Sequence, residues 1–337
     1  MRVRLIDIAR DLNLSSVTIS KALRDADDIS VKTKKRVQKR IKELNYQPDL
    51  RARALATGRT FMIGLVVPEL VNGFFAEIAQ AIASTARKQK YSIVISASGD
   101  DPDLEKEEIE NMLAMGLDAL IIGSVRRTVE VFRGIEEQSV PYVLIDRRFR
   151  GLETNFVGVD DEEVGYLATT HLLDQGCRRI AYIDGPLIST SAGRLMGYHK
   201  ALAERHITPL REFERQRSVR DSDSERTAYL GAKKLLQLPT QPDGIFCHSD
   251  AAAIGAMRAI NERGLRIPED IAVIGCGNVA YAEMLAVPLS SIDQGIASIG
   301  LKAAKLALEA IQSKNTAKPR AVFVKPRLIV RKSTLRG

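Results

Sequence analysis

From Phe61 onward, short apolar segments alternate with longer segments of helical periodicity. The apolar segments have the length of buried strands and are Met62–Val67, Ser92–Ile95, Ala119–Ile122, Tyr142–Ile145, Ile180–Ile183, Ile245–Cys247 and Ile271–Ile274. Helical spacing between them recurs, as in Phe74–Lys90 and Arg194–His206. Repeated strand–helix units predict parallel sheets covered by helices. Because two such series follow one another, we expect two lobes with a ligand cleft between them, at the carboxyl ends of the strands.

The first 60 residues carry the whole net charge of the chain. They contain 15 Lys and Arg against 7 Asp and Glu, a net charge of +8, which is also the formal net charge of all 337 residues. Residues 61–337 therefore hold 35 residues of each sign. A small basic segment joined to a neutral body predicts that the segment binds a polyanion and that the body has another task.

Composition argues against several classes of protein. No apolar run approaches the roughly 20 residues of a membrane helix, and the N-terminus lacks the apolar stretch of a signal peptide. Cys177, Cys247 and Cys276 are too widely spaced for a disulfide framework or a metal knuckle. Zinc-protease, nucleophile-elbow and Walker motifs are absent. We therefore expect a cytoplasmic protein with reduced thiols and with no catalytic residue, cofactor or metal site.

The basic segment has the spacing of three short helices. An apolar face begins at Leu5, Ser15 or Ser16 can cap a second helix, and Ser30 can cap a third. The outward residues of the second helix are short or cationic, namely Ser16, Val17, Ser20 and Lys21. This arrangement predicts a helix-turn-helix whose second helix enters the major groove of DNA. The alternative is a small interaction module with a solvated basic face.

A short helical segment links the basic segment to the body. The third helix stops before Pro48, and residues 50–56 are good helix formers but too few to form a stable helix alone. Leu55 is an apolar residue close to Arg51 and Arg53. We expect Leu55 to act as a wedge between base steps in the minor groove, which kinks the DNA. The alternative is that Leu55 packs on the body or on a second copy of the chain.

Polar and aromatic residues stand where strands end and helices begin in the body. The set comprises Phe74, Phe75, Asp146, Arg147, Arg194, Tyr198, Ser249 and Asp250. Charged hydrogen-bonding groups around an aromatic face suit a sugar or another polyhydroxylated or nitrogenous metabolite. Local alternatives exist, because Asp250 can simply cap a helix and the neighbours Asp146 and Arg147 can form a surface ion pair.

Four motifs of the basic segment carry a family resemblance. They are LIDIARDL at 5–12, LSxxTISKAL at 14–23, ISxxTKxRV at 29–37 and LNYQPD at 44–49. Over nearly its whole length the segment resembles the DNA-binding head of the lactose-repressor (LacI/GalR) family of bacterial transcription regulators. The resemblance implies double-stranded operator DNA as partner and DNA contacts from Ser15, Ser16, Val17, Thr18, Ser20, Lys21, Tyr46, Arg51, Arg53 and Leu55.

The body is similar to the periplasmic-binding-protein-like effector domain of the same family. The similarity lies in segments such as Gly64–Pro68, Leu144–Arg147, Arg194–Tyr198 and Gly264–Ile271. It implies that a small-molecule effector binds to Asn72, Phe74, Phe75, Asp146, Arg194, Ser249, Asp250 and Gln294. It also implies a homodimeric regulator, most simply a repressor of genes for the use of a sugar or related metabolite, with no membrane partner.

The resemblance implies a division of the chain into three parts. We expect an all-α helix-turn-helix head at 1–48, a hinge at 49–60 and an α/β effector-binding and dimerisation domain of two parallel-sheet lobes at 61–337. The chain of the family crosses between lobes three times, and we place the crossings near residues 158, 290 and 320. The lobes then comprise about 61–158 with 290–320, and 159–289 with 321–332.

Departures from the family pattern leave the ligand open, and the sequence permits two other functions. Gly277 stands where the family usually has an acidic residue. Lys21 replaces the usual arginine, and lysine lacks the rigid fork of donors that a guanidinium offers to a base. The run Gly275–Ala280 matches a dinucleotide fingerprint, which predicts an NAD-dependent oxidoreductase, although Pro288 interrupts the crossover. A solute-binding receptor fits the body but does not explain the basic head.

Overall fold

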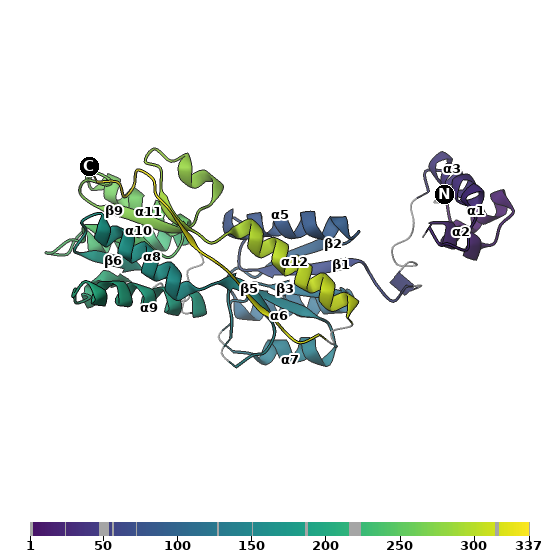
Figure 1. The fold of residues 1–337 in the computed structure, drawn as a ribbon, viewed down its shortest axis with the longest axis horizontal. Coiled ribbons are helices and arrows are strands. Elements are labelled where there is room, and N and C mark those ends of the chain that lie inside the picture. Colours follow the sequence, from purple (N-terminus) through teal and green to yellow (C-terminus); the bar gives the residue numbers. More distant parts are fainter. Residues whose placement is uncertain are drawn as a thin grey trace. The chain divides into compact units, whose positions relative to one another are not determined.

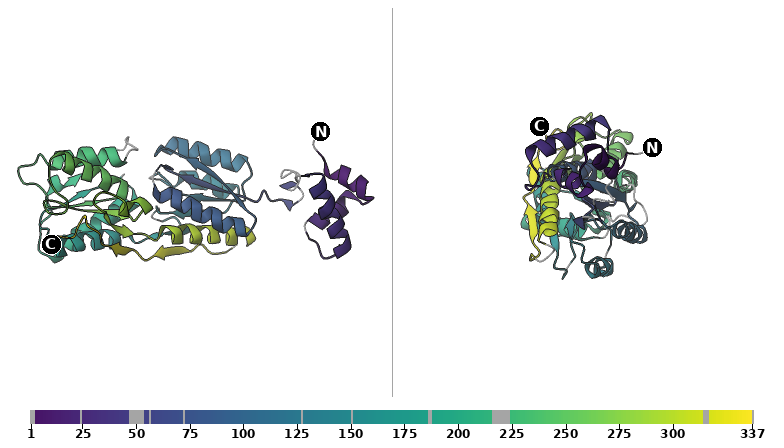
Figure 2. Two further views of the ribbon diagram at one scale, coloured as in Figure 1. Left: turned by 90° about the horizontal axis from the view of Figure 1, so that it is seen from above. Right: turned by 90° about the vertical axis from the view of Figure 1, so that its right-hand side faces the viewer.

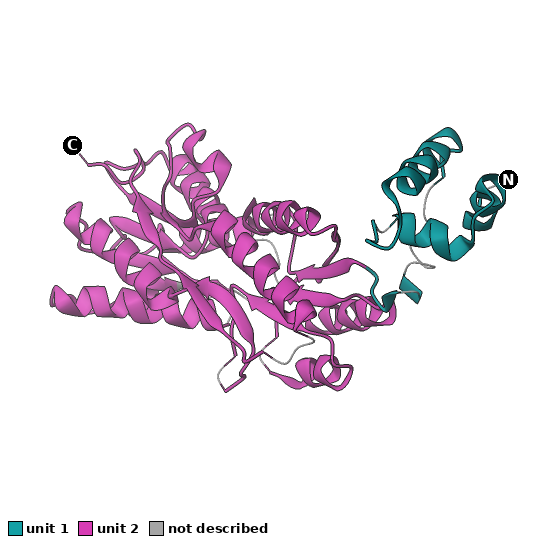
Figure 3. Cartoon of the chain, turned by 45° about the vertical axis from the view of Figure 1, so that its right-hand side comes forward, with its two compact units in different colours: residues 1–60 teal, residues 61–337 magenta. Residues whose placement is uncertain are grey.

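The computed structural model describes residues 3–23, 25–46, 54–55, 57–71, 73–126, 128–149, 151–185, 188–215, 224–313 and 317–336. The chain forms two compact units, the head (Met1–Thr60) and the body (Phe61–Gly337) (Figure 3). Three residues proposed for binding, Arg51, Arg53 and Asn72, lie outside the described residues. Within the described ranges no helix is both long and apolar enough to cross a membrane.

Three helices pack around a small apolar core in the head (Figure 1). They are α1 (Leu5–Leu12), α2 (Ser16–Leu23) and α3 (Val31–Glu43). Ile8, Ile19 and Val37 are fully buried where the helices meet. The turn between α1 and α2 passes through Asn13, whose φ of 54° lies in the left-handed region. Asparagine tolerates this conformation better than most residues, which explains how the turn forms without glycine.

The first lobe of the body is a six-stranded parallel sheet in the order β11-β5-β4-β3-β1-β2 (Figure 1). Its strands are β1 (Met62–Val67), β2 (Ser92–Ala97), β3 (Ala119–Ile122), β4 (Tyr142–Ile145), β5 (Asn155–Val159) and β11 (Ala321–Val324). The helices of this lobe are α5 (Gly73–Lys88), α6 (Pro102–Ala114), α7 (Glu130–Glu137) and α12 (Ile296–Gln312). Helices α5 and α12 pack together on one face, and α6 and α7 cover the other. The central strands are thus buried on both sides, which is why they are continuous apolar runs in the sequence.

The second lobe is a six-stranded sheet in the order β12-β10-β9-β8-β6-β7. Its strands are β6 (Ile180–Ile183), β7 (Glu214–Arg215), β8 (Gly244–Cys247), β9 (Ala272–Gly277), β10 (Ser290–Asp293) and β12 (Arg327–Ile329). Only β12, at one edge, runs antiparallel to its neighbour among the described strands. The helices are α8 (Asp161–Asp174), α9 (Ser189–Glu204), α10 (Ser224–Leu235) and α11 (Asp250–Glu262), with short 3₁₀ turns η1 (Arg211–Phe213) and η2 (Ala280–Glu283).

The chain passes between the lobes three times, and two of the crossings lie further along than the sequence suggested. Strand β10 pairs with β9, so Ser290–Asp293 belong to the second lobe and the crossing falls at Gln294. Strand β11 pairs with β5, so Ala321–Val324 belong to the first lobe and the third crossing follows it (Figure 2). The spacing of residues within a segment does not say which sheet the segment joins, which accounts for the difference.

Candidate functional site

The first turn of helix α2 is fixed by the side chain of Ser15. Its hydroxyl accepts the backbone amide of Thr18 at 3.0 Å and lies 2.8 Å from the Thr18 hydroxyl. This cap starts the helix at Ser16. Ile19 is fully buried, whereas Val17 exposes 61% of its surface. The tip of α2 therefore presents Ser16 and Val17 to solvent, while Ser15 and Thr18 also serve the cap.

Lys21 is the only cation of α2, and its ammonium is already engaged. It forms an ion pair with the carboxylate of Asp28, in the turn between α2 and α3. The hydrogen bond from Lys21 lowers the pKa of Asp28, which stays ionised at neutral pH. Ser20, one position before Lys21, is half-buried. A contact of Lys21 with DNA thus competes with Asp28 for the charge of the ammonium.

Two other candidates of the head differ in their surroundings. Tyr46 is half-buried and packs against the apolar core of the head. Leu55 exposes 89% of its surface. The backbone at Ala54 and Leu55 is helical, and the amide of Gly58 donates to the carbonyl of Ala54 at 2.8 Å. Leu55 is therefore available to a partner, whereas Tyr46 also has a structural role.

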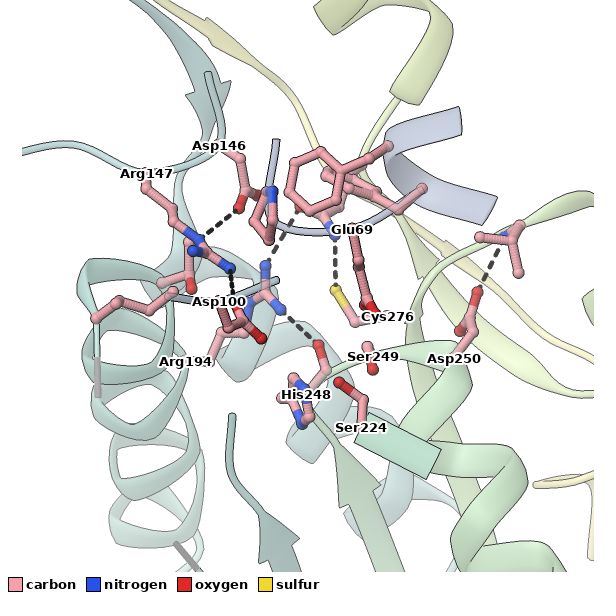
Figure 4. A pocket seen from close by; sticks show the side chains of 17 residues that line it. Glu69, Asp100, Asp146, Arg147, Arg194, Ser224, His248, Ser249, Asp250 and Cys276 are labelled. Atoms are coloured by element: carbon pink, nitrogen blue, oxygen red, sulfur yellow. Dashed lines mark hydrogen bonds and ion pairs between the residues drawn. The ribbon is translucent and has the colours of Figure 1, made fainter. Parts of the chain in front are cut away.

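A cavity opens in the body, lined by residues of both lobes (Figure 4). The empty space within it, counted together with the part that is open to solvent, is about 610 Å³. All effector candidates that the structure describes line it, namely Phe74, Phe75, Asp146, Arg194, Ser249, Asp250 and Gln294. The carboxyl ends of parallel strands meet here, which is why residues far apart in sequence converge.

Arg194 forms hydrogen bonds to three residues around the cavity. Its Nε donates to the Asp161 carboxylate at 3.0 Å, one terminal nitrogen donates to the His248 carbonyl at 2.5 Å, and the other to Gln294 Oε1 at 3.3 Å. Only 5% of Arg194 is exposed. Burial raises the pKa of Asp161 to about 6. Arg194 thus joins helix α9 to the end of β8 and to the crossing segment at Gln294.

The position of Arg194 follows from an unusually close contact between α8 and α9. A Cβ atom added to Gly165 of α8 would collide with the backbone carbonyl of Arg194, and one added to Gly197 of α9 would collide with that of Glu162. The two glycines let the backbones touch and bring Asp161, at the start of α8, beside Arg194. Helix α9 begins at Ser189, so Arg194 lies in its second turn and does not open the helix.

Asp146 and Arg147 form a pair in the cavity wall, not on the surface. Arg147 Nε lies 3.6 Å from the Asp146 carboxylate, and each side chain is only 10% exposed. Arg147 also lies 3.9 Å from Asp100 and donates to the Ser124 carbonyl at 2.9 Å. Asp146 has a φ of 63°, a backbone conformation that turns the chain sharply after β4. The pair is therefore held by the lobe and faces the cavity.

Asp250 stabilises the end of β9 with its carboxylate. One oxygen accepts the Ser291 hydroxyl at 2.6 Å and the other the amide of Val279 at 2.9 Å. Gly275 leaves room for this carboxylate, because a Cβ atom there would collide with it. Burial raises the pKa of Asp250 to about 6. Ser249 is the residue that caps helix α11, since its hydroxyl accepts the amide of Ala252 at 3.1 Å.

One candidate lies elsewhere, and several lining residues were not singled out from the sequence. Tyr198 is fully buried beside Tyr182, and its hydroxyl donates to the Ile180 carbonyl at 2.8 Å, so it belongs to the core of the second lobe. The lining residues that were not predicted from the sequence are Pro68, Glu69, Asp100, Ile188, Thr190, Ser224, His248, Cys276 and Val279. Of these, His248 could have been predicted, because it directly follows strand β8 and precedes the predicted residue Ser249.

The dinucleotide-fingerprint segment does not form a phosphate-binding loop. Strand β9 ends at Gly277 and is followed by the short turn η2, where a full helix is needed to bind a pyrophosphate. Gly275 and Gly277 instead adjoin the Asp250 carboxylate. Gly277 has a φ of 131°, which a residue with a side chain rarely adopts. The oxidoreductase hypothesis therefore lacks its structural basis.

A helix-turn-helix head, an exposed apolar linker residue and a two-lobed body with a polar cavity define a ligand-responsive DNA-binding regulator. Comparison with known families agrees. Residues 4–49 match the bacterial regulatory proteins of the lacI family, and residues 169–334 match the periplasmic binding protein-like domain. The chain belongs to the lacI family of transcription regulators, which confirms the resemblance, the fold class and the non-enzymatic function expected from the sequence.

Similar proteins are known in sequence and in structure. The HTH-type transcriptional repressor PurR of Mannheimia succiniciproducens is 32% identical over 329 residues, 97% of each chain. The structure of the lac repressor dimer bound to operator and the anti-inducer ONPF has a TM-score of 0.86 at 28% identity and covers all of both chains. A complex of the transcriptional regulator CelR with cellobiose has a TM-score of 0.74 at 27% identity and covers 98% of this chain and 100% of CelR.

Proposed function

We propose that this protein is a dimeric, operator-binding transcription repressor whose affinity for DNA is set by a small molecule in the cavity of the body. The observation that carries the proposal is Arg194, which contacts the cavity and also holds Gln294, at a crossing between the lobes, at 3.3 Å. A ligand that engages Arg194 acts directly on the segment about which the lobes move. As a DNA-binding regulator of the lacI family, the protein acts in the cytoplasm.

The head supplies operator recognition. The α2 helices of the two protomers enter successive major grooves of a pseudo-palindrome, with Ser16, Val17 and Lys21 at the base edges. The exposed Leu55 of each chain wedges the central step from the minor groove. The lac repressor dimer has the same organisation of chain and is bound to its operator, which supports this arrangement. Tyr46, Ser20 and the linker arginines Arg51 and Arg53 are assigned to the DNA backbone.

Contacts between the lobes support closure around the ligand as the switch. The amide of Arg148, after β4, donates to the Ser189 hydroxyl of α9 at 3.1 Å. On another path between the lobes, the amide of Ala280 donates to Glu77 of α5 at 3.1 Å. The first joins neutral groups and contributes about 1 kcal/mol, and the second is accepted by a carboxylate and contributes about 1.5–3 kcal/mol. A ligand with a coupling free energy of about 1–3 kcal/mol between the two states is enough to shift operator occupancy.

The lining of the cavity favours an uncharged or cationic effector. Four carboxylates, those of Glu69, Asp100, Asp146 and Asp250, line it against the two guanidiniums of Arg147 and Arg194. Each guanidinium already has a carboxylate partner. A phosphate or an acid would enter a site of net negative charge, which is unfavourable at short range. Hydroxyl and amino groups find acceptors and donors there, and the aromatic side chains of Phe74 and Phe75 suit the apolar face of a sugar ring.

Two experiments test the function. Selection of duplexes from a random pool, with the full-length dimer, should give a pseudo-palindrome whose affinity falls by about 10³-fold or more between 50 and 200 mM salt. A flat salt dependence would contradict the role of the basic head.

The second experiment is a thermal-shift screen of matched sets of ligands. The sets are glucose, glucosamine, gluconate and glucose 6-phosphate, and ribose and adenosine with their phosphates. Preferential stabilisation by an anionic member would overturn the assignment of the ligand class.

A further inference from the structure

We propose that Asp28 is a specificity-determining residue of the head, because its carboxylate competes with DNA for the ammonium of Lys21. The inference rests on the proposed function, in which α2 enters the major groove. Lys21 lies on α2 and Asp28 in the turn before α3, and the two side chains form an ion pair. The pair is open to solvent, since its side chains expose 41% and 55% of their surface. An incoming phosphate or base therefore reaches Lys21 directly.

The pair is not needed to hold the turn. Lys34 of α3 lies 2.7 Å from the Asp25 carboxylate and donates to the Asp25 carbonyl at 3.1 Å. The hydroxyl of Ser30 accepts the amide of Thr33 at 3.2 Å and caps α3. These contacts fix both ends of the segment between α2 and α3. An exposed ion pair such as Lys21–Asp28 adds little to the stability of a fold that is already held in this way.

DNA of arbitrary sequence gains little by displacing Asp28. Lys21 then exchanges one oxygen anion for another, and Asp28 is left without its partner beside a polyanion. At an operator, guanine offers O6 and N7 to the ammonium at a fixed position, which adds directed hydrogen bonds to the exchange. Lysine is a point charge that discriminates poorly by itself. Asp28 therefore weakens binding to random DNA more than binding to the operator.

The neighbouring residue Asp27 supplies a matched control. It lies in the same turn, is exposed, and has no ion pair among the residues that the structure describes. Asp28→Asn and Asp27→Asn remove the same charge from the same turn, but only the first releases Lys21. The full-length variants are compared by fluorescence anisotropy on a random-sequence 30-base-pair duplex and on the selected operator, each with Lys21 intact and with Lys21→Ala.

We expect Asp28→Asn to bind the random duplex about two- to fivefold more tightly than Asp27→Asn, the range of an exposed ion pair. The slope of the logarithm of its binding constant against the logarithm of salt concentration should steepen by about 0.9, which corresponds to one additional phosphate contact. The operator-to-random affinity ratio should fall for Asp28→Asn alone, and with Lys21→Ala the two variants should behave alike. Equal effects of the two single variants, weaker binding by Asp28→Asn, or an effect that persists without Lys21 would each overturn the inference. If the unaltered protein binds no duplex even at 50 mM salt, it is the proposed function that fails.

Discussion

The guanidinium of Arg194 and the carboxylate of Asp161 are joined by a hydrogen bond of 3.0 Å in the interior of the body. Their side chains are only 7% and 13% exposed. A buried pair of this kind adds little net stability compared with apolar packing, but either charge is costly to bury alone. The pair therefore constrains the second lobe as well as the effector cavity.

Removal of one partner should be more harmful than removal of both. Arg194→Met leaves the Asp161 carboxylate buried without a cation, and we expect a loss of about 3–5 kcal/mol in the free energy of unfolding of the body. Arg194→Met combined with Asp161→Asn should recover part of this loss, since no unpaired charge remains. Urea denaturation followed by circular dichroism measures both. Strictly additive losses in this cycle would show that the pair is not coupled.

The contact between α8 and α9 makes a second prediction. Gly165→Ala places a methyl group against the backbone carbonyl of Arg194 and should destabilise the body by about 3 kcal/mol. Gly134 of α7 is the matched control, because nothing lies within 4 Å of a Cβ atom built there. Gly134→Ala should stabilise by about 0.5–1 kcal/mol, the usual gain of alanine in a helix. Similar thermal shifts for the two variants would contradict the packing described for α8 and α9.

The sequence predicted the helices of the head and the convergence of cavity residues because both depend on local order. Capping serines, apolar spacing and polar residues after strands are visible within a few positions, as for Ser15 and Asp146. Their convergence follows from the common direction of parallel strands. The side chains at these positions were therefore found without knowledge of the long-range contacts.

Features that depend on pairing between distant segments were not predictable in the same way. Ser290–Asp293 and Ala321–Val324 form strands that the sequence did not predict, and their sheets are decided by partners more than ten residues away in sequence. Tyr198 lies one helical turn after Arg194 and is nevertheless in the core, where its hydroxyl donates to the Ile180 carbonyl. Ser224 reaches the cavity from the start of α10, where no local pattern marks it.

Asp250 predicts a specific dependence of stability on pH. Burial raises its pKa from 3.8 to about 6 in the folded protein. The folded state thus holds this proton more tightly than the unfolded state does, and the resulting stability is present below pH 3.8 and is lost as pH rises through 6. Relative to Asp250→Asn, the unaltered protein should lose up to about 3 kcal/mol of its free energy of unfolding between pH 4 and 7.

Asp270 is the control for that experiment. Hydrogen bonds from Arg266 lower the pKa of Asp270 to about 2, so both folded and unfolded states keep it ionised above pH 5. The difference in unfolding free energy between Asp270→Asn and the unaltered protein should then stay constant from pH 5 to 7. If Asp250→Asn gives the same flat difference, the carboxylate of Asp250 is not held in the buried environment described.

Leu55 should matter for DNA and not for the ligand. Leu55→Ala removes the exposed side chain proposed to enter the minor groove. Without this wedge the central base step, whose unstacking costs a few kcal/mol, should stay stacked. We expect a smaller bend of the selected operator, measured by the mobility of circularly permuted fragments, and weaker binding. Leu335→Ala, at an exposed leucine of the body, is the control and should leave both unchanged. Because the cavity is lined by residues of the body alone, thermal shifts with the effector should match the unaltered protein. An unchanged bend in Leu55→Ala would mean that Leu55 packs on protein and not between bases.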